Sequence, residues 1–257
     1  DRFGVSGAYL EGLKWIKMLE ANHSLSQKEE WQVNEMKALL LNERGNQDEF
    51  LPIWYKLLKQ YREADRPEDV GKCLLTIANH FIMLEDYENA LPLYKEAYQL
   101  ALEHKSIELQ QVSGIMLIKY LCGAGYYSES LEYYNKIKPE IAFNPSMQNE
   151  VVKSYMELNK PDSARIYLAA RLLSERGDKI VLNCMMAETY IPEGQEDSAF
   201  VFLDRAMKSY KEKAKNYQKQ GREAILPNCF LSPCYLFADL LWKKGKVQQA
   251  NQYYTFV

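Results

Sequence analysis

One spacing of residues occurs six times along this chain, and it limits the folds that the chain can adopt. In the clearest copy, residues 70–104, Ala78 is followed by Ala90 twelve residues later, by Tyr94 after four more and by Ala97 after three more. The other copies keep these offsets: Ala38, Phe50, Trp54 and Leu57; Ile118, Ser130, Tyr134 and Ile137; Val152, Ala164, Leu168 and Arg171; Ala187, Ala199, Leu203 and Ala206; Ala238, Ala250, Tyr254 and Val257. Repetition of this kind is typical of solenoids, whose units pack on their neighbours.

Each copy reads as two α-helices joined by a tight turn. In residues 70–104, Leu74, Ile77 and Phe81 share one face of a helix, and the pattern stops near Glu85 before it resumes. The small residues of the ladder let two helix backbones approach closely, and such a pair needs a similar neighbour to bury both apolar faces. Gly and Pro are few, and 47% of the residues are hydrophobic, which suits a helical chain with a large core.

This ladder resembles the tetratricopeptide repeat (TPR), a helix–turn–helix unit of about 34 residues. The resemblance covers roughly residues 30–257, although Ile118, Ser130 and Arg171 occupy places where the family prefers small residues. It implies a single all-α domain, a right-handed TPR-like superhelical solenoid of about six helix–turn–helix units. We expect an N-terminal helix in residues 1–25 and helical pairs at 26–66, 67–106, 107–143, 144–177, 178–222 and 223–257.

The last two copies are spaced unusually far apart. First ladder members lie 40, 40, 34, 35 and 51 residues apart. The long final step predicts an extended helix from Ser198 to Gly221, followed by an irregular bridge through Pro227 and Pro233. A basic run on that helix carries two interleaved tyrosines, but Glu212 lies among the charges and the net charge is −3, so we expect a solvated helix and no nucleic-acid partner.

The sequence lacks the motifs of common enzyme classes. Gly71-Lys72 has neither the upstream Gly nor the following Ser/Thr of a phosphate-binding loop. Zinc sites need clustered ligands, whereas the three histidines are scattered and His80 is expected to be structural or on the surface. No Cys-x-x-Cys pair occurs among the five cysteines, which we expect to be small buried residues. We therefore expect no enzymatic activity, no cofactor and no metal.

A TPR solenoid implies a concave groove lined by the first helix of each pair. Two positions of each first helix should face this groove. One is the residue directly after the first ladder member, such as Asn79 after Ala78, and the other lies four residues before it, such as Leu75. The candidate binding residues are Glu35, Leu75, Asn79, Lys119, Asn149, Lys153, Glu188, Tyr235 and Asp239; Leu39, Ile115 and Cys184 occupy the same positions. Charge along this surface suits an extended peptide or a helix, and simple solvation of an exposed face is the open alternative.

Two resemblances bear on the partner. Chaperone-binding TPR proteins clamp a terminal carboxylate with Lys and Asn; Asn79 matches one such Asn, but Leu75 stands where a Lys is needed, which argues against that clamp. The turn phrases at 160–164 and 195–199 resemble repeat-containing sensor regions of bacterial membrane-anchored regulators. That likeness implies a signalling protein and an extracytoplasmic (periplasmic) location for this region, with a cytoplasmic location as the alternative. Because the chain starts at Asp1 without Met or a signal-like stretch and stops at Val257 inside a helical pattern, we expect a fragment or processed form.

We expect a non-enzymatic module that binds a protein or peptide, such as the sensor or interaction part of a bacterial regulator. The alternative is a scaffold or homo-oligomerisation domain that uses residues 222–236 and the Tyr-rich end, Tyr253 and Tyr254, as a subunit interface. No direct membrane span is expected, because the most apolar stretch, residues 224–242, is interrupted by Pro, Asn, Ser and Asp.

Overall fold

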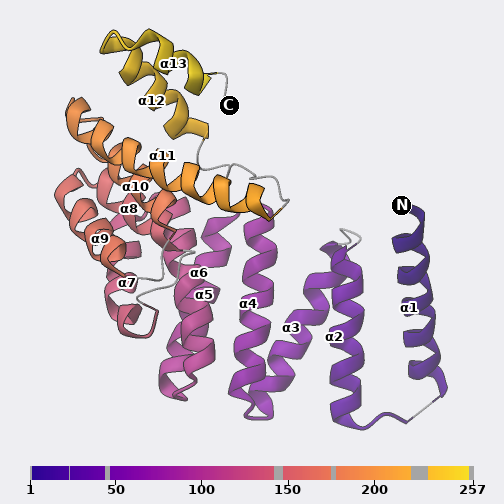
Figure 1. Cartoon of the computed structure of the whole chain (residues 1–257). Helices are drawn as coiled ribbons and strands as arrows, with labels where there is room; N and C mark the ends of the chain where they lie inside the picture. The colour runs from indigo at the N-terminus through magenta and orange to yellow at the C-terminus, as the bar shows by residue number, and fades with distance from the viewer. Residues whose placement is uncertain are drawn as a thin grey trace. The chain divides into compact units, whose positions relative to one another are not determined.

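A computed structural model of this chain describes residues 2–22, 24–43, 47–141, 147–174, 178–220 and 231–254. Throughout these residues the regular elements are helices, and no strand occurs among them (Figure 1). The prediction of an all-α chain built from successive helical pairs is confirmed. None of the described helices is both long enough and apolar enough to cross a membrane.

The chain divides into two compact units, Asp1–Tyr120 and Leu121–Val257. Unit 1 contains α1 (Arg2–Asn22), α2 (Gln27–Glu43), α3 (Gln47–Glu63), α4 (Pro67–Met83), α5 (Tyr87–Glu103) and most of α6 (Ile107–Gly123). Unit 2 contains α7 (Tyr127–Ile141), α8 (Gln148–Glu157), α9 (Pro161–Leu173), α10 (Lys179–Glu188), α11 (Glu196–Lys219), α12 (Leu231–Lys243) and α13 (Val247–Tyr254). Helices adjacent in sequence pack on one another, such as α4 on α5 in unit 1 and α10 on α11 in unit 2.

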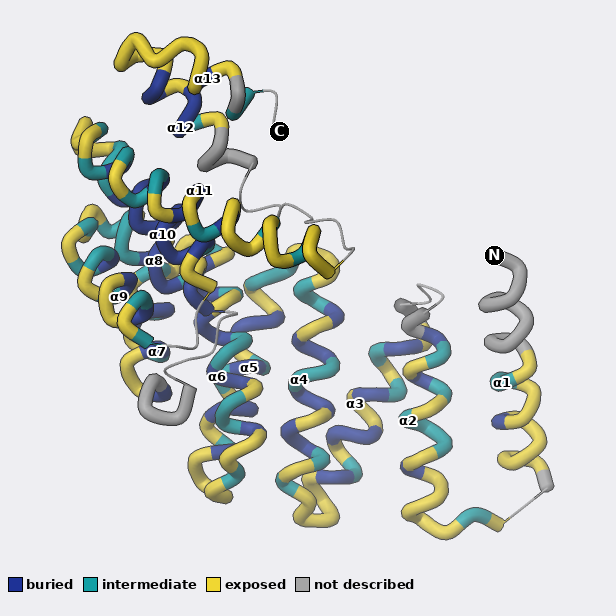
Figure 2. Tube along the Cα trace, in the orientation of Figure 1, coloured by how far each residue is buried: buried dark blue, intermediate teal, exposed yellow. Residues whose placement is uncertain are grey.

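The repeated ladder lies in the core of these pairs. In the clearest copy, Ala78, Ala90, Tyr94 and Ala97 are all 0% exposed. The described members of the other copies are buried as well, except Tyr254, which is half-buried, and Val257 lies outside the described residues. Figure 2 shows the resulting pattern, with buried stretches on facing sides of neighbouring helices such as α3 and α4. Ladder spacing therefore predicted the packing side of each helix.

One backbone turn closes the first helix of five pairs. The N–H of one residue donates to the carbonyl five residues earlier: Asp86 to Phe81 (2.9 Å), Tyr126 to Leu121 (2.8 Å), Lys160 to Tyr155 (2.9 Å), Gln195 to Tyr190 (3.1 Å) and Lys246 to Leu241 (2.9 Å). The residue before each donor has a positive φ, at Glu85, Gly125, Asn159, Gly194 and Gly245. This is the Schellman arrangement, which ends a helix and satisfies its last carbonyls. Asp86 then caps α5 by accepting from the Asn89 N–H.

The long helix is confirmed, but the bridge after it is shorter than predicted. α11 runs over Glu196–Lys219, its buried residues end at Tyr210, and its remaining turns are mostly exposed (Figure 2). Gly221 and Pro227 lie outside the described residues. The expectation that Pro233 belongs to the irregular bridge is wrong, because α12 already begins at Leu231. A proline near the start of a helix is tolerated since the first N–H groups have no helical acceptor.

Candidate functional site

Unit 1 has a cleft between the first helices of two successive pairs. The cleft lies between α4 and α6 and measures about 300 Å³, and its apolar lining, called the floor below, consists of Leu75, Leu109 and Val112. Ser106 and three charged side chains complete its lining: Glu68, Lys72 and Glu108. An apolar floor with a charged edge is what a site for one apolar side chain of a partner needs.

A glycine sets how closely α4 and α6 approach. Gly71 is buried, and a Cβ added there would lie 2.3 Å from the Leu109 Cδ2 atom. Leu109 itself is only 9% exposed, so it fills the space that a side chain at position 71 would need. The same leucine forms part of the cleft floor. The depth of the cleft therefore depends on the absence of a side chain at Gly71.

Asn79, a predicted groove residue of unit 1, is held by Tyr94, on whose ring Tyr120 stacks. The Tyr94 hydroxyl donates to Asn79 Oδ1 over 2.5 Å, and the Tyr120 ring stacks on the Tyr94 ring at 5.3 Å between centroids. Burial and the neighbouring Tyr120 raise the pKa of Tyr94, so its hydroxyl stays protonated and remains a donor. Asn79 is exposed, and its amide nitrogen has no acceptor among the described residues. Tyr120 was not predicted as a site residue, since the ladder does not include its position.

The other predicted residues of unit 1, Glu35, Lys119 and Leu75, differ in their exposure and in their contacts. Glu35 is half-buried and accepts a 2.6 Å hydrogen bond from the Tyr61 hydroxyl. Lys119 is exposed, and its Nζ lies 5.3 Å from the centroid of the Tyr120 ring. Leu75 is half-buried on the cleft floor. The structure thus brings Leu75 to a cleft, while it engages Glu35 in a tyrosine contact.

In unit 2 the predicted residues are exposed. Asn149 and Lys153 lie on α8, where Lys153 Nζ is 6.0 Å from the centroid of the Tyr127 ring. Glu188 ends α10, and removal of its carboxyl from water raises the pKa of this group although the residue as a whole is exposed. Tyr235 is 49% exposed, and Asp239 accepts a hydrogen bond from the Tyr254 hydroxyl.

The expectation that Cys184 faces the groove is wrong. Cys184 is only 2% exposed, and most other residues of α10 are buried as well. α10 is short and packs on both α9 and α11, so its ladder face and its opposite face are covered alike.

In unit 1, burial raises the pKa of the Cys73 thiol to about 12, which leaves this cysteine protonated and unreactive at neutral pH.

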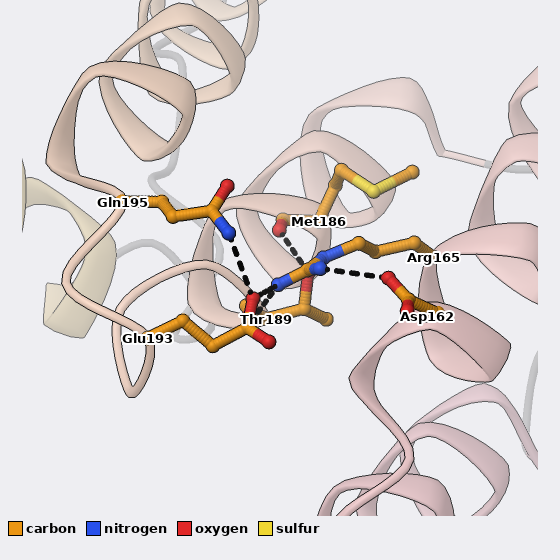
Figure 3. A network of polar contacts seen from close by, with 6 residues as sticks. All are labelled: Asp162, Arg165, Met186, Thr189, Glu193 and Gln195. Carbon is orange, nitrogen blue, oxygen red and sulfur yellow. Dashed lines mark hydrogen bonds and ion pairs between the residues drawn. The ribbon is translucent and has the colours of Figure 1, made fainter.

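A polar network around Arg165 in unit 2 was not predicted from the sequence (Figure 3). Arg165 of α9 donates to the Thr189 carbonyl at 2.7 Å and the Thr189 hydroxyl at 3.2 Å, and pairs with Asp162 at 3.0 Å and with Glu193. Its guanidinium lies 4.0 Å from the centroid of the Tyr190 ring. These contacts tie the start of α9 to the turn between α10 and α11. The only sequence signal was the Asp162–Arg165 pair at i, i+3, which is common on exposed helices.

The comparisons with known proteins bear on the fold. No family model and no curated protein matches this chain. The crystal structure of BtubC (BKLC) from P. vanneervenii is similar, with a TM-score of 0.59 and 14% sequence identity, over 86% of this chain and 92% of that one. At this identity the likeness concerns the helical fold alone, so the function has to be argued from the surface of this chain.

Proposed function

We propose that this chain is a degenerate TPR protein that binds a protein or peptide without enzymatic activity, in the manner of a sensor or interaction domain of a bacterial regulator. The observation that carries the proposal is the cleft between α4 and α6. Its floor of Leu75, Leu109 and Val112 is apolar, and its edge carries charges of both signs. Val112 is 38% exposed, which places apolar surface in reach of a partner.

The ladder supports the repeat assignment. Five pairs share the same carbonyl-closing turn after the same ladder position, as expected of a repeated unit. In a repeat of this kind, the residues that maintain the stack are buried, and residues of the first helices remain free to vary with the partner. Leu75 and Val112 belong to first helices, so ligand specificity in unit 1 falls on them.

The experiment is a peptide selection followed by titration. Random peptides displayed on phage are selected on the purified chain, and the recovered peptides are titrated by fluorescence anisotropy. Val112→Asn should weaken their binding at least about tenfold, because a polar amide then lies on the apolar floor. Leu102→Asn is the matched control: Leu102 is 43% exposed on α5 and does not line the cleft, so binding should stay within about twofold of wild type.

Two results would overturn the proposal. Equal binding of the selected peptides to wild type and Val112→Asn would move the site away from this cleft. A failure to recover peptides, together with a dimer in light scattering that Val112→Asn dissociates, would assign the cleft to the alternative function of homo-oligomerisation.

A further inference from the structure

Unit 2 contains a second pocket, formed where the turn after α10 meets α12 and the start of α11. It measures about 270 Å³. Its apolar lining consists of Ile191, Leu236, Leu240 and Trp242, and its charged lining consists of Glu196, Asp239 and Lys243. Ligand pockets for whole small molecules usually hold about 300–1,000 Å³, so this pocket is the size for a single side chain.

An aromatic surface is available at this pocket. Trp242 lines it and is 53% exposed, although large aromatic side chains are usually buried for most of their area. The indole ring has an electron-rich face, which attracts cations and stacks well on a flat guanidinium. Tyr235, two turns earlier on α12, is 49% exposed, and the centroid of its ring lies 6.4 Å from that of the Tyr254 ring. About half of the surface of each of these two aromatic side chains is therefore exposed to solvent.

The charges at the pocket leave negative charge in excess. Lys243 is the only cation of the lining, and its Nζ lies 2.9 Å from Glu196 Oε1. Asp239 is bound by the neutral Tyr254 hydroxyl and acts on Lys243 only at longer range. Two carboxylates thus face one ammonium.

We propose that this pocket binds the side chain of an arginine from a partner protein, with the guanidinium stacked on Trp242 and paired with the Asp239 carboxylate. Arginine fits better than lysine, because its planar group satisfies an aromatic face and a carboxylate at once, whereas an ammonium is a strongly hydrated point charge. The apolar stem of the arginine would cover Leu236 and Ile191. This proposal does not rest on the cleft of unit 1, since the two sites share no residue.

The test uses N-acetyl-arginine-methylamide as the probe and NMR of the indole N–H groups of the ¹⁵N-labelled full chain. The signal of Trp242 is identified by its loss in Trp242→Phe. The probe should shift this signal saturably with a millimolar Kd, while the neutral isostere N-acetyl-citrulline-methylamide should bind at least about fivefold more weakly, because it lacks the charge. Raising the salt concentration should weaken binding of the arginine probe.

Asp239→Asn should raise the Kd of the arginine probe about fivefold, since the amide can still accept from Tyr254 but no longer carries charge. Asp239 is exposed, so the variant should keep the circular dichroism spectrum of wild type. Glu212→Gln is the matched control: it removes an exposed carboxylate of α11 away from the pocket and should leave the Kd unchanged. Equal shifts with arginine and citrulline, no shift of Trp242, or an unchanged Kd in Asp239→Asn would each overturn the proposal. Loss of peptide binding at the unit 1 cleft would leave this result untouched.

Discussion

The cleft of unit 1 and the pocket of unit 2 are built by different means. The cleft lies between two first helices, α4 and α6, whereas the pocket is formed by α12, the start of α11 and the turn after α10. The cleft is shaped by apolar contact, with Leu109 filling the space beside Gly71. The pocket borders a turn fixed by the Arg165 network and has an excess of carboxylates. One repeated scaffold therefore gives a surface sensitive to side-chain volume and another sensitive to charge.

The largest loss of stability from a single substitution is expected in the core of unit 1. Tyr94→Ala should destabilise the protein by about 3–5 kcal/mol, because it leaves a cavity where a fully buried ring stood. Tyr94→Phe keeps the ring and loses the hydroxyl, with its hydrogen bond to Asn79, so its cost should be about 0.5–1.5 kcal/mol. Urea denaturation followed by circular dichroism measures both. Equal losses would show that the hydroxyl, rather than the packing of the ring, supports unit 1.

In unit 2 we expect the polar contacts of Arg165 to contribute to stability. Arg165→Met keeps most of the aliphatic stem but removes the side-chain donor of the Thr189 carbonyl and the ion pairs with Asp162 and Glu193, which should cost about 2–3 kcal/mol. Arg165→Lys should recover only part of this loss, because one ammonium cannot reach four acceptors in fork geometry. Thermal unfolding in low and high salt measures both variants. If Lys restores full stability, the planar geometry of the network has no role.

The volume dependence of the cleft is tested at Gly71. Gly71→Ala should destabilise by about 1–2 kcal/mol, since the new Cβ would lie 2.3 Å from Leu109 Cδ2 and the leucine would have to move. Gly71→Ala combined with Leu109→Ala should cost less than the sum of the two single changes, because the smaller side chain leaves room for the added methyl. Additive losses in this double-mutant cycle would place the strain elsewhere than at Leu109.

The smallest expected effect is the contribution of one histidine of unit 1 to the pH dependence of stability. All three histidines lie in unit 1, and His80 is 4% exposed, with its ring 4.7 Å from that of Phe50. Burial lowers the pKa of His80. The unfolded chain therefore binds this proton near pH 6.5, where the folded protein does not, and stability should fall as the pH decreases from about 6.5 towards the lowered pKa, by at most about 1.4 kcal/mol per pH unit.

His80→Phe should reduce this pH dependence, since a phenyl ring keeps the aromatic packing and cannot be protonated. Denaturation curves of wild type and variant at about pH 7 and about pH 5 provide the measurement. Other groups titrate in both proteins, so the difference between the two slopes isolates His80. Identical slopes would show that His80 is protonated equally in the folded and unfolded chain.

The repeat could be predicted from sequence because it depends on local spacing. Small and aromatic residues at fixed offsets identify the packing side of each helix, and even Arg171, at a position where the family prefers a small residue, is 3% exposed. Which residues are exposed on the first helices was harder to predict, because exposure depends on how many neighbours cover a helix. Cys184 fits the groove position but lies on a helix that is covered on both sides. Trp242 and Arg165 lie outside the ladder, and only the folded chain shows their surroundings.

The packing of helices on their neighbours in sequence has a consequence for how this protein folds. Contacts between adjacent helices require only short loops to close, so little chain entropy is lost before native contacts form. Chains with such low contact order fold quickly, and each hairpin can form before the next one is available. The protein should therefore begin to acquire native structure during its synthesis, starting from the hairpins of unit 1.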